Sequence, residues 1–162
     1  MIYFDACYIA KFYLAETDSA KVIAYAQTQT VVNCLVIGKA EVIAVFHRKY
    51  REQIVDENGY RLLCDQFEAD CAHGLWQWLP LDDALLKLTA NHFRKLPPSI
   101  FLRASDALHL GLRRRCGLRH HPHQRPPHAR RRLCLRFKRS DSVRPYPRMQ
   151  WKVRSLLDWE NR

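Results

Sequence analysis

Three carboxylates of this 162-residue chain occupy positions where an acid could do chemistry: Asp5, Glu41 and Asp106. Asp5 directly follows the apolar run Ile2-Tyr3-Phe4, which predicts a strand buried on both faces. Open α/β sheets bind ligands at the carboxyl ends of such strands. Asp5 could equally be the N-cap of the helix that we predict after it. This segment alone therefore leaves a structural and a functional role open.

Glu41 lies in a helix that we predict over residues 35–50. The spacing of its apolar residues predicts one core-facing side that also contains Glu41. The apolar positions on that side are Ile37, Ala40, Ala44 and Val45. A buried, unpaired carboxylate costs several kcal/mol or changes its pKa. Glu41 is therefore either a functional acid or half of a structural ion pair, with an arginine such as Arg103.

Asp106 lies in the segment 103–112, which predicts a helix. Ser105 is a suitable N-cap, and Asp106 would then lie in the first turn, where a carboxylate favours the helix dipole. A purely structural role is therefore available to Asp106 as well. Asp82 and Asp83 open another predicted helix, and we interpret both as structural for the same reason.

Acids far apart in sequence that converge in space need cations to stay ionised together. Hard divalent ions such as Mg²⁺ or Mn²⁺ bind carboxylate oxygens and keep water ligands. Such an ion can activate water against a phosphodiester and neutralise the developing charge. The three acids thus suggest a metal-dependent hydrolase, although their spacing alone is a weak signal.

The elements that must position these acids alternate between strands and helices. Strands are predicted at the N-terminus, at residues 30–32 and at residues 75–81. Helices are predicted over residues 8–15, from residue 18, over 35–50 and 56–73, from 82, and from about 103. Alternation of this kind indicates an α/β fold, with a parallel sheet flanked by helices.

The length predicts a single domain with a sizeable core. No apolar run approaches the roughly 18 residues of a membrane span, and no signal peptide precedes the first strand. The six cysteines show no CxxC spacing, so we expect free thiols. These features predict a cytoplasmic protein without a membrane partner.

The net charge of +11 is unevenly distributed. Residues 1–116 hold 14 Lys/Arg and 13 Asp/Glu, whereas residues 117–162 hold 13 Lys/Arg and 3 Asp/Glu. The C-terminal segment therefore differs in chemistry from the rest of the chain.

Three segments together resemble the PIN-domain family, and within it the VapC-type toxins of bacterial toxin–antitoxin systems. They are residues 2–7 (Ile-Tyr-Phe-Asp-Ala-Cys), residues 39–42 (Lys-Ala-Glu-Val) and residues 103–110 (Arg-Ala-Ser-Asp-Ala-Leu-His-Leu). The resemblance covers residues 1 to about 116, and the Asp-Ala-Leu-His-Leu block is its most specific part. Ala6 departs from it, because family members often have Ser or Thr there.

The resemblance implies a PIN-like sheet and a Mg²⁺- or Mn²⁺-dependent endoribonuclease that acts as the toxin of a type II system. It assigns Asp5, Glu41 and Asp106 as the catalytic, metal-binding acids. It also implies an RNA substrate, a cognate antitoxin that inserts into the acidic groove, and a homodimer. His109 is left out of this site, because a histidine one turn along a helix is more often a packed residue than a ligand.

The resemblance ends after Gly117, where a PIN domain continues with a strand ending in Thr-x-Asp, a fourth acid and a further helix. No acid occurs here between Asp106 and Asp141, and prolines from Pro122 onwards exclude a central strand. We therefore expect an incomplete PIN domain over residues 1–117 that lacks its last strand and helix. Residues 118–162 would form a basic, largely disordered tail rich in Arg, His and Pro.

A one-base frameshift near codons 113–118 would explain this tail. With suitable synonymous codons, residues 119–132 read one base later encode Ile-Ile-His-Thr-Asn-Asp and then a helix-like segment. That reading supplies the missing strand and acid at the right place. The chain as written would then be a catalytically impaired remnant that only binds antitoxin or RNA. Two alternatives remain: an evolved nucleic-acid-binding arm, or a basic coating protein with an unrelated α/β core.

Overall fold

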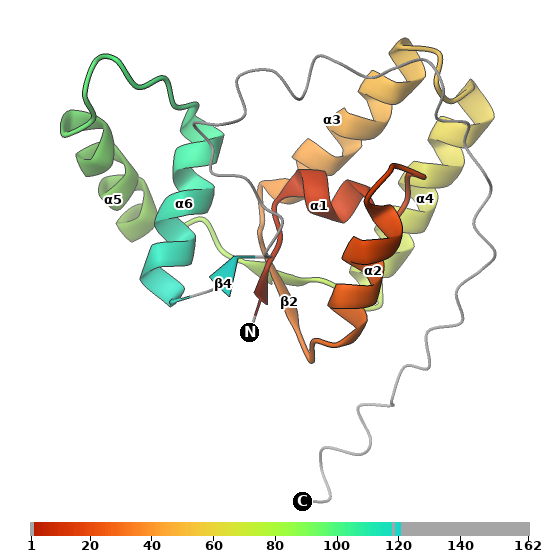
Figure 1. Cartoon of the computed structure of the whole chain (residues 1–162), viewed down its shortest axis with the longest axis horizontal. Coiled ribbons are helices and arrows are strands. Elements are labelled where there is room, and N and C mark those ends of the chain that lie inside the picture. The colour runs from red at the N-terminus through yellow and green to blue at the C-terminus, as the bar shows by residue number, and fades with distance from the viewer. Residues whose placement is uncertain (1, 118, 121–162) are drawn as a thin grey trace, which may run out of the picture.

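The computed structural model of this protein describes residues 2–117 and 119–120 (Figure 1). Its strands are β1 (Ile2–Tyr3), β2 (Val32–Leu35), β3 (Gln77–Leu79) and β4 (Arg119–His120). Its helices are α1 (Ala6–Ala10), α2 (Ser19–Gln27), α3 (Gly38–Arg51), α4 (Glu57–Ala72), α5 (Asp83–Arg94) and α6 (Ala104–Cys116).

The strands form a small parallel sheet in the order β3-β2-β1-β4. Ile2 pairs with Val32, and Tyr3 pairs with Asn33. The Asn33 side chain donates to the carbonyl oxygen of Ile2 at 3.1 Å, which satisfies a buried amide inside the sheet. The prediction of an α/β fold with a parallel sheet is confirmed. Because β1 lies between β2 and β4, its carboxyl end opens at the middle of the sheet.

Alternation along β1 divides the core between the two faces of the sheet. Ile2 and Phe4 belong to a large cluster with side chains from α1 to α4, among them Ile9, Val42 and Phe67. Tyr3 points to the other face. There it joins a smaller cluster of residues from β2, α5 and α6, namely Leu35, Leu85 and Leu112. Figure 1 shows the same division, with α5 and α6 on one side of the strands and α1 to α4 on the other.

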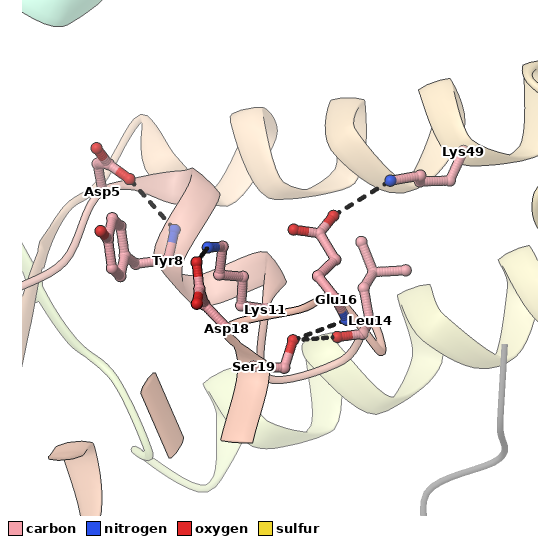
Figure 2. Close-up of polar contacts among 8 residues, drawn as sticks. All are labelled: Asp5, Tyr8, Lys11, Leu14, Glu16, Asp18, Ser19 and Lys49. Atoms are coloured by element: carbon pink, nitrogen blue, oxygen red, sulfur yellow. Dashed lines mark hydrogen bonds and ion pairs between the residues drawn. The ribbon is translucent and has the colours of Figure 1, made fainter. Parts of the chain in front are cut away.

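The connection between α1 and α2 is fixed by polar contacts (Figure 2). The Ser19 hydroxyl donates to the carbonyl oxygen of Leu14 at 2.6 Å and accepts the backbone N–H of Glu16 at 3.0 Å. The Glu16 carboxylate lies 3.2 Å from the ammonium of Lys49, which belongs to α3. Only 3 % of the Lys49 side chain and 16 % of the Glu16 side chain are exposed. This pair therefore ties the connection between α1 and α2 to the last turn of α3.

Three helices begin close to their predicted positions. α2, α4 and α5 each begin one residue after the predicted start, and α4 also ends one residue before its predicted end. The second strand was predicted at residues 30–32 but runs over Val32–Leu35. The first helix was predicted over residues 8–15, but α1 runs over Ala6–Ala10, because Asp5 caps its start and turns follow it from residue 11. Ser105 is not an N-cap, since α6 begins at Ala104 and Arg103 takes the cap position without a side-chain bond.

The predicted core-facing side of α3 is wrong in part. Its buried residues are Gly38, Val42, Phe46 and Lys49, whereas Ala40 and Ala44 are exposed. The helix begins at Gly38 because residues up to Leu35 belong to β2. Glu41 therefore lies beside the buried stripe, with 31 % of its side chain exposed, and not in its middle.

A strand follows α6, contrary to our expectation. The two residues of β4 pair in parallel with β1, on the edge opposite β2. Parallel pairing uses backbone groups alone, and the first proline after α6 is Pro122, so two residues can join the sheet edge. Our other predictions for the tail concern residue 118 and residues 121–162, which lie outside the described part of the chain.

The cysteines and helices give two further results. The five cysteines of the described part are free thiols, as predicted, and Cys134 lies outside that part. Within residues 2–117 and 119–120, no helix is both long and apolar enough to cross a membrane.

Candidate acidic site

Asp5 lies at the carboxyl end of β1 and caps α1. Its Oδ1 accepts the backbone N–H groups of Cys7 at 3.1 Å and Tyr8 at 3.2 Å, and Figure 2 shows the bond to Tyr8. These bonds satisfy two amides that the first turn of a helix leaves without partners. The capping role is thus confirmed, and it involves one of the two carboxylate oxygens. Asp5 remains half-buried.

Glu41 lies in the first turn of α3 and contacts α6. Its Oε2 is 2.8 Å from Nε2 of His109. The partner of Glu41 is therefore a histidine, and the predicted ion pair with an arginine such as Arg103 is not what the structure contains. The contact brings the start of α3 against the middle of α6, across the end of the sheet.

Asp106 is half-buried in the first turn of α6. It precedes His109 by three residues, and residues so spaced are neighbours on a helix surface, with about 5–6 Å between their Cβ atoms. His109, one turn further along the same side of α6, is the residue that contacts Glu41. The three predicted acids thus come from the end of β1, from α3 and from α6.

Tyr3 and Arg113 connect the acids electrostatically. Burial raises the pKa of the Tyr3 phenol far above its usual range, and the nearby Cys34 and the carboxylates of Asp5 and Glu41 raise it further. Burial lowers the pKa of the Arg113 guanidinium, whereas Tyr3 and Asp5 act in the opposite direction. Both acids are therefore close to Tyr3, and a partly buried positive charge lies near Asp5.

The three acids do not form a metal centre as they are arranged here. Among the described residues, no three His, Cys, Asp or Glu side chains lie close enough together to hold a metal ion. Their carboxylates are the donors that a hard divalent ion prefers. However, Glu41 is bound to His109, and Asp5 is bound to the amides of α1. The donor types fit such an ion, but their present arrangement does not.

Three residues of this region, namely Tyr3, His109 and Arg113, were not predicted as site residues. Asp106, His109 and Arg113 are spaced by three and four residues, which places them along one side of α6. This spacing is the signal that could have grouped His109 and Arg113 with the acids. Tyr3 could have been found by alternation along β1, because it points away from the face of Ile2 and Phe4.

Comparison with known proteins gives no assignment. The chain matches no protein-family model, and no curated protein matches it at a significant level. The resemblance to PIN domains therefore stays a prediction from the sequence motifs.

Proposed function

We propose that this chain is a PIN-type, metal-dependent endoribonuclease, the toxin of a type II toxin–antitoxin pair. One observation carries the proposal: Asp5 and Glu41, which lie far apart in sequence, are both near Tyr3 of β1, and α6, the helix of Asp106, contacts Glu41 through His109. Parallel α/β sheets bind their ligands at the carboxyl ends of their strands, where Asp5 follows β1. The parallel sheet with helices on both faces is compatible with a PIN-like fold.

The three acids are the proposed ligands of Mg²⁺ or Mn²⁺. When bound, such an ion supplies an activated water and neutralises charge on the phosphate. The chain's own residues hold and orient the carboxylates: the amides of α1 fix one oxygen of Asp5, and His109 fixes one oxygen of Glu41. Arg113 adds a positive charge beside Asp5, which favours the approach of a phosphodiester.

The proposed partners follow from the same function. They are an RNA substrate, a cognate antitoxin that binds at the acidic site, and a second copy of the chain. The proposed compartment is the cytoplasm.

An RNA-cleavage assay with carboxamide variants tests the proposal. Asp5→Asn keeps an oxygen that can cap α1, and Glu41→Gln keeps an oxygen that can accept from His109, so both substitutions remove charge and spare the fold. We expect cleavage in Mg²⁺ or Mn²⁺, its loss in EDTA, and a reduction of about 100-fold or more in either variant. Asp65→Asn, at an exposed position in α4, is the control. Metal-dependent cleavage that persists in Asp5→Asn would contradict the proposal.

A second candidate is a catalytically impaired remnant that binds RNA or antitoxin without cutting. It is favoured by the arrangement of the acids, which do not form a metal centre within the described residues. The sequence also places no acid between Asp106 and Asp141. Filter binding of RNA separates the two candidates: binding without cleavage, unchanged by Asp5→Asn, indicates the remnant.

A further inference from the structure

The loop between α5 and α6, residues 95–103, carries the most exposed large apolar side chain of the described residues. Phe101 is 68 % exposed, and Ile100 beside it is 43 % exposed. The loop contains a turn in which the backbone N–H of Ile100 donates to the carbonyl oxygen of Pro97 at 3.0 Å. Because Pro97 and Pro98 each have a fixed φ, this backbone has less freedom to lose when a ligand binds the Phe101 ring.

The same part of the chain is basic. Residues 84–105 contain four Lys/Arg and no Asp/Glu. Three of these cations, Arg94, Lys95 and Arg103, are exposed and lie within seven residues of Phe101 along the chain. Within the described part of the chain, none of the three forms an ion pair with a carboxylate. The loop therefore offers an exposed aromatic ring and uncompensated positive charge, which complements a polyanion.

The topology places this loop at the end of the sheet where Asp5 and the first turn of α6 lie. α6 ends at Cys116, and β4 begins at Arg119 and runs parallel to β1. The end of α6 therefore lies at the amino ends of the strands, and its start, which follows the loop, lies at their carboxyl ends. Figure 1 shows the loop at the end of α5 and α6 away from β4. Phe101 precedes Asp106 by five residues, a span of at most about 18 Å.

A single strand of RNA fits these features better than an acidic protein does. Protein interfaces are built around anchors that close apolar neighbours enclose and shield from water. A nucleotide base needs only one exposed ring on which to stack, and its phosphates need cations beside that ring. Phe101 supplies the ring, and Arg103, two residues further on, supplies the nearest cation in the sequence.

We propose that residues 94–103 form a platform for single-stranded RNA, on which Phe101 stacks with a base while Arg94, Lys95 and Arg103 contact phosphates. The inference rests on the proposed function and deepens it, because it names the segment that holds the RNA substrate near Asp106. Binding to this RNA platform needs no metal ion.

The first test measures the affinity for a short fluorescein-labelled RNA without secondary structure, by fluorescence anisotropy in EDTA. We expect Phe101→Ala to weaken binding by about 5-fold or more, and Phe101→Trp to bind at least as tightly as the wild type. Phe101→Leu keeps an apolar side chain but removes the ring, so it should be weakened as well. Leu62→Ala, at a 59 % exposed apolar residue of α4, is the control, and circular dichroism confirms folding.

The salt dependence of the same binding separates the ring from the cations. The logarithm of the affinity falls with the logarithm of the salt concentration, by about 0.7 for each phosphate contact of a single strand. Arg103→Gln should therefore reduce this slope by about 0.7, whereas Phe101→Ala should leave it unchanged. Arg51→Gln, at an exposed residue that ends α3, is the charge control. The basic C-terminal segment is present in every variant, so differences between variants report the loop.

Three results would overturn the proposal. They are a wild-type protein that binds no RNA, a folded Phe101→Ala variant with wild-type affinity, and a Phe101→Leu variant with wild-type affinity, which would mean that no base stacks on the ring. Competition with polyglutamate addresses the other polyanion. If polyglutamate displaces the RNA at equal concentration of charges, the platform is a site for an acidic protein and the RNA assignment is wrong.

Cleavage in Mg²⁺ separates this inference from the proposed function. If the wild type and Phe101→Ala bind and cleave RNA alike, the proposed function stands and the inference fails. If the wild type binds RNA through Phe101 in EDTA but cleaves nothing in Mg²⁺, the nuclease function fails and the RNA platform stands.

Discussion

At the scale of single residues, Asp5 combines a structural bond with a proposed chemical role, and substitutions can separate the two. Its Oδ1 caps α1 through the amides of Cys7 and Tyr8. Replacing a capping aspartate by alanine costs about 0.5–2 kcal/mol, whereas asparagine caps about as well. We therefore expect Asp5→Ala to lower the free energy of unfolding by about 1 kcal/mol and Asp5→Asn to leave it nearly unchanged. Urea unfolding measures both, and equal losses would show that the cap contributes little.

A second residue-scale prediction concerns the ion pair of Lys49 with Glu16, which is largely buried (Figure 2). Hydrogen bonds to charged groups contribute more when water is excluded, about 1.5–3 kcal/mol. We expect Glu16→Gln to lower the free energy of unfolding by about 1–3 kcal/mol.

The matched control for that prediction is Glu57→Gln. It breaks the pair of Glu57 with Arg61, in which both side chains are more than half exposed. Exposed pairs contribute about 0–1 kcal/mol, so this change should be small. Similar urea midpoints for the two variants would mean that burial does not strengthen the pair of Glu16 with Lys49.

At the scale of elements, the packing of α5 on α6 depends on a glycine. A Cβ added at Gly111 would lie 3.1 Å from Cδ1 of Leu85 and 3.3 Å from Oγ1 of Thr89. Leu85 is fully buried and has little room to move. Alanine is normally favoured over glycine in a helix by about 1 kcal/mol, yet here we expect Gly111→Ala to destabilise the protein by about 1 kcal/mol or more. A thermal unfolding midpoint above that of the wild type would contradict this.

The element types were predictable because their local signals are strong. Asp18, Asp56 and Asp82 mark the starts of three helices in the sequence, and apolar periodicity marks the helical segments that follow. β2 was misplaced because Thr30 and Val31 have high strand propensity, whereas the strand extends through Asn33, whose amide is satisfied only by pairing with β1. A side chain's long-range partner cannot be read from local propensity.

The same reason limits the prediction of the candidate site. The acids were found from local patterns, but the buried side of α3 includes Lys49, and its carboxylate partner Glu16 comes from a distant segment. The bond of His109 to Glu41 joins residues 68 positions apart. The sequence offered a histidine one turn beyond Asp106, yet only tertiary packing shows what that histidine binds.

At the scale of the whole molecule, neither the short strand β4 nor the basic composition of the C-terminal segment matches the domain end that the resemblance to PIN domains implies. β4 adds two residues to the sheet at the place where the resemblance requires a longer strand with a fourth acid. We predict that resequencing the gene across codons 113–139 finds one base missing or extra. The corrected frame should encode a strand ending in Thr-x-Asp. A confirmed sequence with no such shifted frame would eliminate the frameshift hypothesis.

The central claim is that Asp5, Glu41 and Asp106 serve one cation at the carboxyl end of β1. Its most direct test is a titration with Mn²⁺ that is monitored by electron paramagnetic resonance. The titration compares the wild-type protein with Asp5→Asn, Glu41→Gln and Asp106→Asn, and Asp65→Asn is the control. We expect one bound ion whose affinity falls by about 10-fold or more in each of the three site variants and not in the control. No bound ion, or an ion that all three variants bind as the wild type does, would contradict the account.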